Sequence, residues 1–248
     1  MSRRVVWFSC GAASAVAAKL AVEKYGDGCT VVYCDTSGDE HPDNLRFLSD
    51  VEKWIGRSIE RICSTEYAGV DDVIQRVRYM AGVAGARCTV ELKKRPREKW
   101  QRPDDVHIFG YTVEERARAD QFEDNNPALA VEWVLIDGFV TKRECLNRIS
   151  EAGIEIPAMY RLGFEHNNCI GCVKATSAGY WNKVRKYFPE IFEKRARQSR
   201  LLGVKLARMG EQRVFLDDIP NDANEPDDDI DCGPVCQMPL PLGMYDRS

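Results

Sequence analysis

Two groups of cysteines are the residues of this sequence best suited to chemistry. Cys169 and Cys172 form a C-x-x-C pair on a glycine-bearing loop, and Cys232 and Cys236 lie together near the C-terminus. Two thiolates at that spacing can bind one metal centre. Taken alone, the first pair indicates zinc, a dithiol redox pair or two ligands of an iron–sulfur cluster. His166 is a further candidate ligand, although a single histidine on a turn more often only forms hydrogen bonds.

Ten cysteines in 248 residues are many for a reducing compartment, where disulfides rarely persist, so we expect some of them to bind metal or to do redox chemistry. Cys88 lies among polar and glycine-rich neighbours, like the two groups above. The other interior cysteines have apolar neighbours and are predicted to be small buried hydrophobes; they are Cys29, Cys34, Cys63 and Cys145. No apolar run approaches the roughly 20 residues that cross a bilayer, and no secretory segment is recognisable. We therefore expect a cytoplasmic protein.

The second chemical feature is the turn at residues 9–14. A β-branched and aromatic run ends in small residues and restarts as an alanine-rich run, which predicts a strand, a tight turn and a helix. Unpaired N–H groups at the start of such a helix form an anion site, and the Ser9 and Ser14 hydroxyls add donors. The alternative is an ordinary first turn of an α/β domain.

A second buried strand, at residues 30–33, ends in Cys34, Asp35 and Thr36. These side chains fall at the edge where parallel sheets bind ligands. Asp35 could accept a hydrogen bond from a ribose or an adenine, hold a cation, or cap a helix.

Further strands and helices must position these residues. We expect strands over 59–64, 106–111 and 131–136, and helices over 42–55, 70–79 and 141–153. Leu45, Leu48, Val51, Trp54 and Ile55 are predicted core positions of the first of these helices. Residues 180–202 form a basic amphipathic pattern interrupted near Pro189. The alternation predicts an α/β fold, with a mostly parallel twisted sheet and helices on both faces.

Local charge suggests two further features, although the net charge of −4 favours no polyanion-binding surface as a whole. Lys93, Lys94, Arg95, Arg97 and Lys99 cluster beside Trp100. This run is either a solvated face or an electropositive rim for a nucleotide or nucleic acid. Residues 217–231 are acidic and rich in Asn and Pro, which predicts a mobile arm that carries the last two cysteines.

Together these segments resemble the phosphoadenylyl-sulfate (PAPS) reductase family of the adenine-nucleotide α-hydrolase superfamily, over about residues 5–174. Ser9, Cys10, Gly11, Ala12 and Ser14 are similar to the family's phosphate-binding PP-loop. Asp35 and Thr36 are similar to its Asp-Thr-Gly segment, with Ser37 in place of the glycine. Tyr160, Gly163 and Phe164 match the family's lead into its C-x-x-C pair, which is the most specific likeness.

The resemblance implies a Rossmann-like PP-loop domain over residues 1–175, followed by a helical extension over 176–215 and a cysteine-bearing tail over 216–248. It implies that Cys88, Cys169 and Cys172 ligate a [4Fe–4S] cluster. The reductases carry two adjacent cysteines at the first position, whereas Cys88 stands alone. One iron then remains for Cys232 or Cys236, or stays open to sulfide or substrate, and the thiolate set favours iron–sulfur or zinc over hard cations.

Two branches of the family offer two functions. In the ATP-using branch, Gly110, Thr112 and Glu115 would lie beside the nucleotide, and ATP, with or without Mg²⁺, would drive sulfur insertion into a nucleobase or similar acceptor. In the reductases a tail cysteine attacks an adenylyl sulfate, and Cys232 has a similar context. The arginine expected to hold sulfate is missing there, with Arg116 and Arg118 as substitutes. Ala13 replaces an acidic residue of both PP-loops.

The leading prediction is therefore ATP-dependent thiolation, with Cys232 and Cys236 as catalytic residues. The alternatives are thiol-dependent reduction of an adenylyl sulfate and a non-catalytic, nucleotide-sensing iron–sulfur module. The expected partners are an adenine nucleotide, a sulfur donor or thiol reductant, and a nucleotide or nucleic-acid acceptor. No membrane is expected, and a homodimer is left open.

Overall fold

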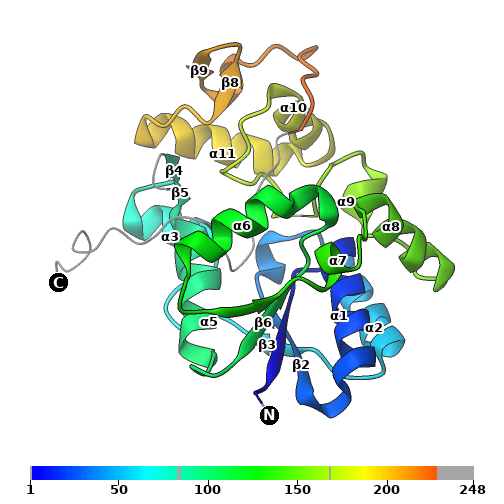
Figure 1. Cartoon of the computed structure of the whole chain (residues 1–248). Helices are drawn as coiled ribbons and strands as arrows, with labels where there is room; N and C mark the ends of the chain where they lie inside the picture. The colour runs from blue at the N-terminus through cyan, green and yellow to red at the C-terminus, as the bar shows by residue number, and fades with distance from the viewer. Residues whose placement is uncertain (1, 83–84, 168, 228–248) are drawn as a thin grey trace.

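The computed structural model describes residues 2–82, 85–167 and 169–227, and within them a five-stranded parallel sheet forms the centre of the fold (Figure 1). Its strands are β1 (Arg4–Phe8), β2 (Cys29–Cys34), β3 (Glu60–Ile62), β6 (Val106–Phe109) and β7 (Ala130–Glu132). They are arranged in the order β3-β2-β1-β6-β7, and all pairs are parallel. The chain moves outward from β1 through β2 to β3 and then returns to the other side of β1. The gap between β1 and β6 is therefore the switch point, where open α/β sheets bind ligands.

Helices cover both faces of the sheet, as the sequence predicts. They are α1 (Ala12–Tyr25), α2 (Asp43–Ile55), α3 (Val70–Val77), α4 (Arg87–Thr89), α5 (Arg95–Trp100), α6 (Arg116–Asn125), α7 (Val134–Asp137), α8 (Lys142–Glu151), α9 (Ala158–Arg161), α10 (Ala178–Tyr187) and α11 (Pro189–Leu202). Alternate residues of β1 point to opposite faces. Val6 and Phe8 pack with residues of α1, α2 and α8, whereas Val5 and Trp7 pack with residues of α6.

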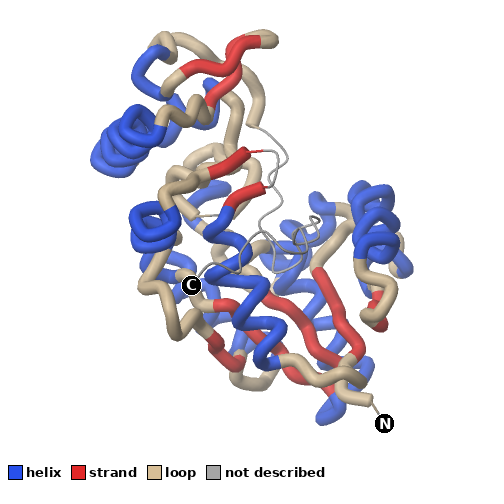
Figure 2. Tube along the Cα trace, turned by 90° about the vertical axis from the view of Figure 1, so that its left-hand side faces the viewer, coloured by secondary structure: helices blue, strands red, loops and turns tan. Residues whose placement is uncertain are grey.

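A separate apolar cluster, which we call the upper core, lies outside the sheet. It joins residues 70–92 and 159–175 to α10, α11 and the chain up to Ile219. Two small antiparallel hairpins accompany it, formed by β4 (Ala81–Gly82) with β5 (Gly85–Ala86) and by β8 (Ala207–Met209) with β9 (Gln212–Val214). Figure 2 shows the helices of this region set apart from the strands of the sheet. The upper core therefore combines residues of the predicted PP-loop domain (1–175) with residues of the predicted helical extension (176–215).

Two local predictions differ from the structure. The strand expected over 131–136 is β7 followed by α7, because the chain turns at Trp133 into a short helix that packs against α1. Leu45, expected in the core, is 43% exposed. The break of the C-terminal helix near Pro189 is confirmed, since α10 ends at Tyr187 and α11 begins at Pro189 with its proline at the start.

The first part of the acidic arm also differs from the prediction of a mobile segment. The Asn182 side chain donates to the carbonyls of Pro220 and Ala223, and the Lys183 ammonium lies 2.6 Å from the carboxylate of Asp227. A Cβ at Gly179 would approach the Glu225 carbonyl oxygen to 2.0 Å, so the arm lies directly on α10. Within the described ranges, no helix has the length and apolar composition needed to cross a bilayer.

Candidate functional site

The turn between β1 and α1 is held by its own serines. The Ser14 hydroxyl accepts hydrogen bonds from the Ser9 backbone N–H and the Ser9 hydroxyl, both at 3.1 Å, and donates to the Gly11 carbonyl at 3.0 Å. Ser14 is 4% exposed, so these bonds are shielded from water. The N-cap residue of α1 is Gly11, which has no side chain to cap the helix. The helix start therefore presents backbone N–H groups at the switch point, as the anion-site prediction requires.

Gly110, at the end of β6, packs directly on this turn. A Cβ at Gly110 would lie 2.5 Å from the Ser14 nitrogen and 2.6 Å from its Cα. Only glycine permits this approach, because the atoms in the way belong to the backbone. The ends of β1 and β6, 100 residues apart in sequence, therefore form one surface.

Tyr160, on α9, lies on the other side of the turn. Its hydroxyl accepts a hydrogen bond from the Ala12 backbone N–H, and burial raises its pKa to about 12. A Cβ at Gly11 would lie 3.5 Å from this hydroxyl oxygen. Tyr160 therefore occupies one of the helix-start donors and limits the space above Gly11.

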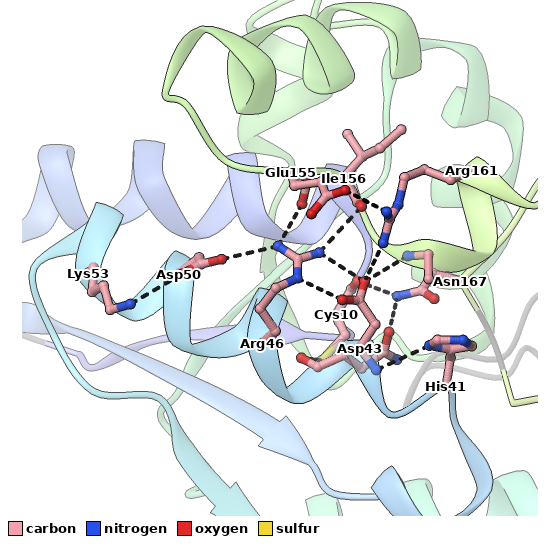
Figure 3. Close-up of polar contacts among 12 residues, drawn as sticks. Cys10, His41, Asp43, Arg46, Asp50, Lys53, Glu155, Ile156, Arg161 and Asn167 are labelled. Carbon is pink, nitrogen blue, oxygen red and sulfur yellow. Dashed lines mark hydrogen bonds and ion pairs between the residues drawn. The ribbon is translucent and has the colours of Figure 1, made fainter.

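Cys10 has a left-handed backbone (φ 56°), which a non-glycine residue adopts only where its surroundings require it. The Asn167 side-chain amide donates to the Cys10 carbonyl at 2.6 Å and to the Asn44 side-chain oxygen at 2.8 Å. Figure 3 shows Cys10 and Asn167 near the start of α2. Burial raises the pKa of the Cys10 thiol well above its usual value, which favours the neutral thiol.

Asp43, at the start of α2, is the centre of the ionic contacts in Figure 3. Its carboxylate accepts hydrogen bonds from Arg46 at 2.7 and 2.8 Å and from the Ala158 backbone N–H at 2.8 Å. The hydrogen bond from Arg46 lowers the pKa of Asp43 to about 2, against the effect of burial. Arg161 also approaches this carboxylate, at 3.5 Å. Asp43 thereby ties α2 to the segment that leads to the cysteine pair.

Thr112 and Glu115 follow Gly110 and form a capping box. The Thr112 backbone N–H and hydroxyl donate to the Glu115 carboxylate at 3.0 and 3.2 Å. The other Glu115 oxygen accepts from Arg118, whose guanidinium lies over the Tyr111 ring. Glu115 is therefore engaged in holding the β6–α6 turn.

At the end of β2, Asp35 and Thr36 have different roles. One Asp35 oxygen accepts from the Ser37 backbone N–H at 2.9 Å, and the other lies 4.0 Å from Arg61. Thr36 is buried, and its hydroxyl donates to Glu40 at 2.5 Å.

Glu40 is a buried carboxylate that the sequence analysis missed. It is 5% exposed and also accepts from the Tyr33 hydroxyl and the Asn44 amide, both at 2.8 Å. Lys93 lies 3.9 Å away. The Asn44 side-chain oxygen accepts a hydrogen bond from Asn167, so the network extends to that residue. The acidic run after β2 offered no signal that this carboxylate, rather than Asp35, would be the buried one.

Asp39 connects the end of β2 with two parts of the upper core. Its carboxylate accepts from the Val70 backbone N–H at the start of α3, at 2.8 Å, and its carbonyl accepts from the Ile170 N–H at 2.9 Å. A Cβ at Gly69 would lie 2.8 Å from this carboxylate. Burial raises the pKa of Asp39. Ile170 lies between the two cysteines, so the cysteine loop is bonded to the end of β2.

The predicted metal ligands Cys88, Cys169 and Cys172 all lie in or against the upper core. Cys169 and Cys172 are 6% and 5% exposed members of it, and Cys88 packs against it. The Tyr180 hydroxyl accepts from the Cys172 backbone N–H at 2.9 Å and lies 3.5 Å from the Cys169 carbonyl. Among the described residues, no three His, Cys, Asp or Glu form a group that could hold a metal ion.

Gly171 gives the cysteine loop its shape. It has φ +65°, and a Cβ there would lie 2.8 Å from Cγ2 of Ile191. Arg195, also on α11, donates to the Gly171 carbonyl at 3.2 Å and pairs with Asp71 of α3. The loop is thus bonded to α11, which an ion pair joins to α3. The predicted catalytic residues Cys232 and Cys236 lie outside the described residues.

The basic run at 93–99 is mostly interior, contrary to the solvated-face alternative. Lys93, Lys94 and Arg97 are 8%, 7% and 3% exposed, because a π-helical turn (Val90–Lys94) and α5 direct them inward. Arg95 and Lys99 line a cavity of about 330 Å³ beyond the end of β3, together with Trp100. Of this run, only Arg95 and Lys99 remain candidates for the predicted electropositive rim.

The remaining cysteines are mostly structural, as predicted. Burial raises the pKa of Cys29 to about 11 and those of Cys34 and Cys145 to about 12. Cys63 differs from its prediction, because it lies just beyond the short edge strand β3 and is exposed.

Comparison with protein-family models and with curated proteins finds no match to this chain.

Proposed function

We propose that this protein is an adenine-nucleotide-binding iron–sulfur enzyme of sulfur metabolism that catalyses ATP-dependent sulfur insertion into a nucleobase or similar acceptor. The observation that carries the proposal is the hydrogen bond from Asn167 to the Cys10 carbonyl. It joins the candidate phosphate turn to the segment that carries Cys169 and Cys172. Two chemistries that the resemblance to the PAPS reductase family implies would therefore operate at neighbouring loops.

The nucleotide would bind with its phosphates at residues 9–14. Backbone N–H groups at the start of α1 would donate to the phosphate oxygens, and the Ser9 hydroxyl would add a donor only by exchanging its hydrogen bond to Ser14 for one to phosphate. Gly110 keeps this surface free of side-chain atoms on the β6 side. Asp35, half-buried at the end of β2, would accept hydrogen bonds from the ribose hydroxyls.

Cys88, Cys169 and Cys172 would hold the [4Fe–4S] cluster. Their thiols suit such a cluster in donor chemistry, and all three belong to or pack against the upper core, although the structure does not gather these described residues into one metal-holding group. They would supply three of the four thiolates that such a cluster takes, which would leave one iron for Cys232, Cys236 or an exogenous sulfur ligand. When bound, the cluster would supply iron with high affinity for sulfide.

In the reaction, the acceptor carbonyl oxygen would attack the α-phosphate of ATP and release pyrophosphate. The α1 turn would hold the triphosphate and stabilise the charge that develops on it. A hydrosulfide or Cys232 persulfide would then attack the activated carbon, and AMP would leave with the former carbonyl oxygen. With the persulfide as donor, the acceptor carbon would be joined to Cys232 through an S–S bond. Cys236 would attack the Cys232 sulfur and release the thiolated product, and an added thiol would reduce the resulting Cys232–Cys236 disulfide. We place this activity in the cytoplasm, since the thiols require a reducing compartment.

A second function, reduction of an adenylyl sulfate, is favoured by the position of Arg118. Its guanidinium lies beside the β6–α6 turn, over Tyr111 and next to Glu115, where it could pair with a sulfate group. The Cys232 thiolate would attack the sulfate sulfur and expel the adenosine phosphate. A second thiol would then attack the Cys232 sulfur and release sulfite.

The test uses full-length protein reconstituted anaerobically with iron and sulfide. One sample receives ATP, Mg²⁺, sulfide and a pool of cellular nucleic acids, and another receives adenylyl sulfate with a thiol. Pyrophosphate release with sulfur incorporation supports thiolation, whereas sulfite release that is lost in Cys232→Ser supports reduction. Nucleotide binding with neither product indicates a nucleotide-sensing module. A colourless, zinc-loaded protein would overturn the iron–sulfur assignment.

A further inference from the structure

Two hydrogen bonds attach the cysteine loop to the sheet edge, one on each side of Cys169. The Asn167 amide donates to the carbonyl of Cys10 in the β1–α1 turn at 2.6 Å. The Ile170 backbone N–H donates to the carbonyl of Asp39, after β2, at 2.9 Å. Figure 3 shows the first of these contacts directly. Both partners lie in loops that surround the candidate nucleotide site.

The Asn167 contact lies inside a buried network. Asn167 and Asn44 are 6% and 1% exposed, and the chain of hydrogen bonds runs from the Cys10 carbonyl through Asn167 and Asn44 to Glu40. Buried polar chains of this kind are strong when complete, and costly to leave half-made. The strained backbone of Cys10 depends on the same support. The β1–α1 turn and the cysteine loop are therefore ordered together.

Cys169 and Cys172 are too buried to react with a reagent in solution unless their loop opens locally. Opening at Asn167 would break its bond to Cys10 and release the strained turn. A ligand that fixes the turn makes this opening less frequent. Thermodynamic linkage then requires that a closed cysteine loop strengthens binding of the ligand.

We propose that Asn167 is a positioning residue that couples nucleotide occupancy of residues 9–14 to the reactivity of the Cys169/Cys172 loop. Phosphate groups bound at the β1–α1 turn slow the opening of the cysteine loop, and a closed cysteine loop tightens nucleotide binding. The inference rests on the proposed function and adds regulation of its site. The contacts of Tyr180 and Arg195 hold the loop from the upper-core side and do not carry this coupling.

The experiment measures thiol alkylation in the full-length, cluster-free, reduced protein. Iodoacetamide is added with and without saturating ATP, and peptide mass spectrometry follows Cys169 and Cys172. Cys145, buried in the core beneath α1, reports global unfolding, and an added cysteine peptide reports reagent loss. We expect ATP to slow alkylation of the loop thiols about tenfold, within the usual range of coupling between sites, and to leave the peptide unchanged.

In Asn167→Ala, Cys169 and Cys172 should be alkylated faster than in the wild type when ATP is absent. Saturating ATP should slow this alkylation less than twofold. Asn182→Ala is the matched control, because Asn182 also donates to two carbonyls but lies on α10, away from the turn. It should retain tenfold protection. If Asn167→Ala does not fold, Asn167→Leu preserves the volume and removes the hydrogen bond.

The controls separate this inference from the proposed function. Calorimetric titration establishes whether ATP binds to each protein. Bound ATP without protection in the wild type, or full protection in the Asn167 variant, overturns the coupling and leaves the proposed function intact. A wild type that binds no ATP overturns the proposed function, and with it the inference.

Discussion

The β1–α1 turn and the cysteine loop are built in opposite ways. The turn is made by a contiguous stretch, and its serines bond to one another over five residues. The cysteine loop is held by α3, α11 and Tyr180, and by Asp39 and Asn167 contacts to the sheet edge. Hydrogen bonds between nearby residues thus shape the first region, which Gly110 and Asn167 then support, whereas the second depends mainly on contacts between distant segments.

This difference has an energetic consequence. A local turn forms at a small cost in chain entropy, whereas contacts between distant segments form only after the loops between them close. We therefore expect changes in the turn to act mainly on ligand binding, and changes around the cysteine loop to act on the stability of the upper core.

The largest expected effect comes from Gly110→Ala, which tests the packing of the distant end of β6 on the turn. The new Cβ would lie 2.5 Å from the Ser14 nitrogen, and backbone cannot move aside as a side chain can. We expect a loss of about 3 kcal/mol of stability or more, with loss of ATP binding. Denaturant unfolding and calorimetry measure both. Gly28→Ala, where a Cβ meets nothing within 4 Å, should cost less than about 0.5 kcal/mol. Similar losses in the two variants would refute tight packing at the switch point.

Gly171→Ala tests the long-range region. It combines backbone strain at φ +65° with a contact of 2.8 Å to Ile191 Cγ2, so we expect a loss of about 2–3 kcal/mol and a lower iron content after reconstitution. Unfolding by urea and iron analysis measure these effects. Gly153→Ala has a similar φ of +71° but open space, and should lose only about 1 kcal/mol. Equal losses of stability in the two variants would mean that the Ile191 side chain moves aside at no cost.

Asp43 ties α2 to the segment that leads to the cysteine pair, and the pH dependence of stability tests this contact. Its pKa is about 2 in the folded protein and 3.8 ordinarily, because the bonded Arg46 favours the charged form. The stabilisation is therefore present above pH 4 and lost as pH falls from 4 to 2. Allowing for partial exposure, we expect about 1–2 kcal/mol. Asp43→Asn should lack this loss in urea titrations across that range. Asp120→Asn, in an exposed pair, should behave as wild type; an unchanged acid profile in Asp43→Asn would contradict the prediction.

Ser14→Ala should have the smallest effect on stability and a specific effect on binding. It removes the acceptor of the Ser9 N–H and hydroxyl, so we expect a loss of about 1 kcal/mol and about tenfold weaker ATP binding. Calorimetric titration provides the affinity, and Ser150→Ala, at an exposed site on α8, is the control. If stability falls sharply while affinity is unchanged, the turn is structural and not a phosphate site.

Much of the fold follows from short-range patterns in the sequence. Buried β-branched runs predict β1 and β2, and Pro189 marks the boundary of α10 and α11. The prediction is wrong where packing decides: Trp133 turns the chain into α7, and Leu45 points to solvent although its helical spacing matches the core. For the site, the sequence located the turn, Gly110 and the cysteines. It could not indicate Glu40, Asn44 or Asn167, since a polar residue has no pattern that reports its burial.

The sequence by itself determined the parallel α/β fold and the small residues of the β1–α1 turn, because strand composition and glycine placement act within a few residues. Only the tertiary structure decided that Gly110 packs on Ser14, that three lysines and arginines of a basic run lie inside, and that Asn167 bonds to Cys10. The reason is physical. Packing and buried hydrogen bonds depend on which segments meet, and residues distant in sequence meet only once the whole chain has folded.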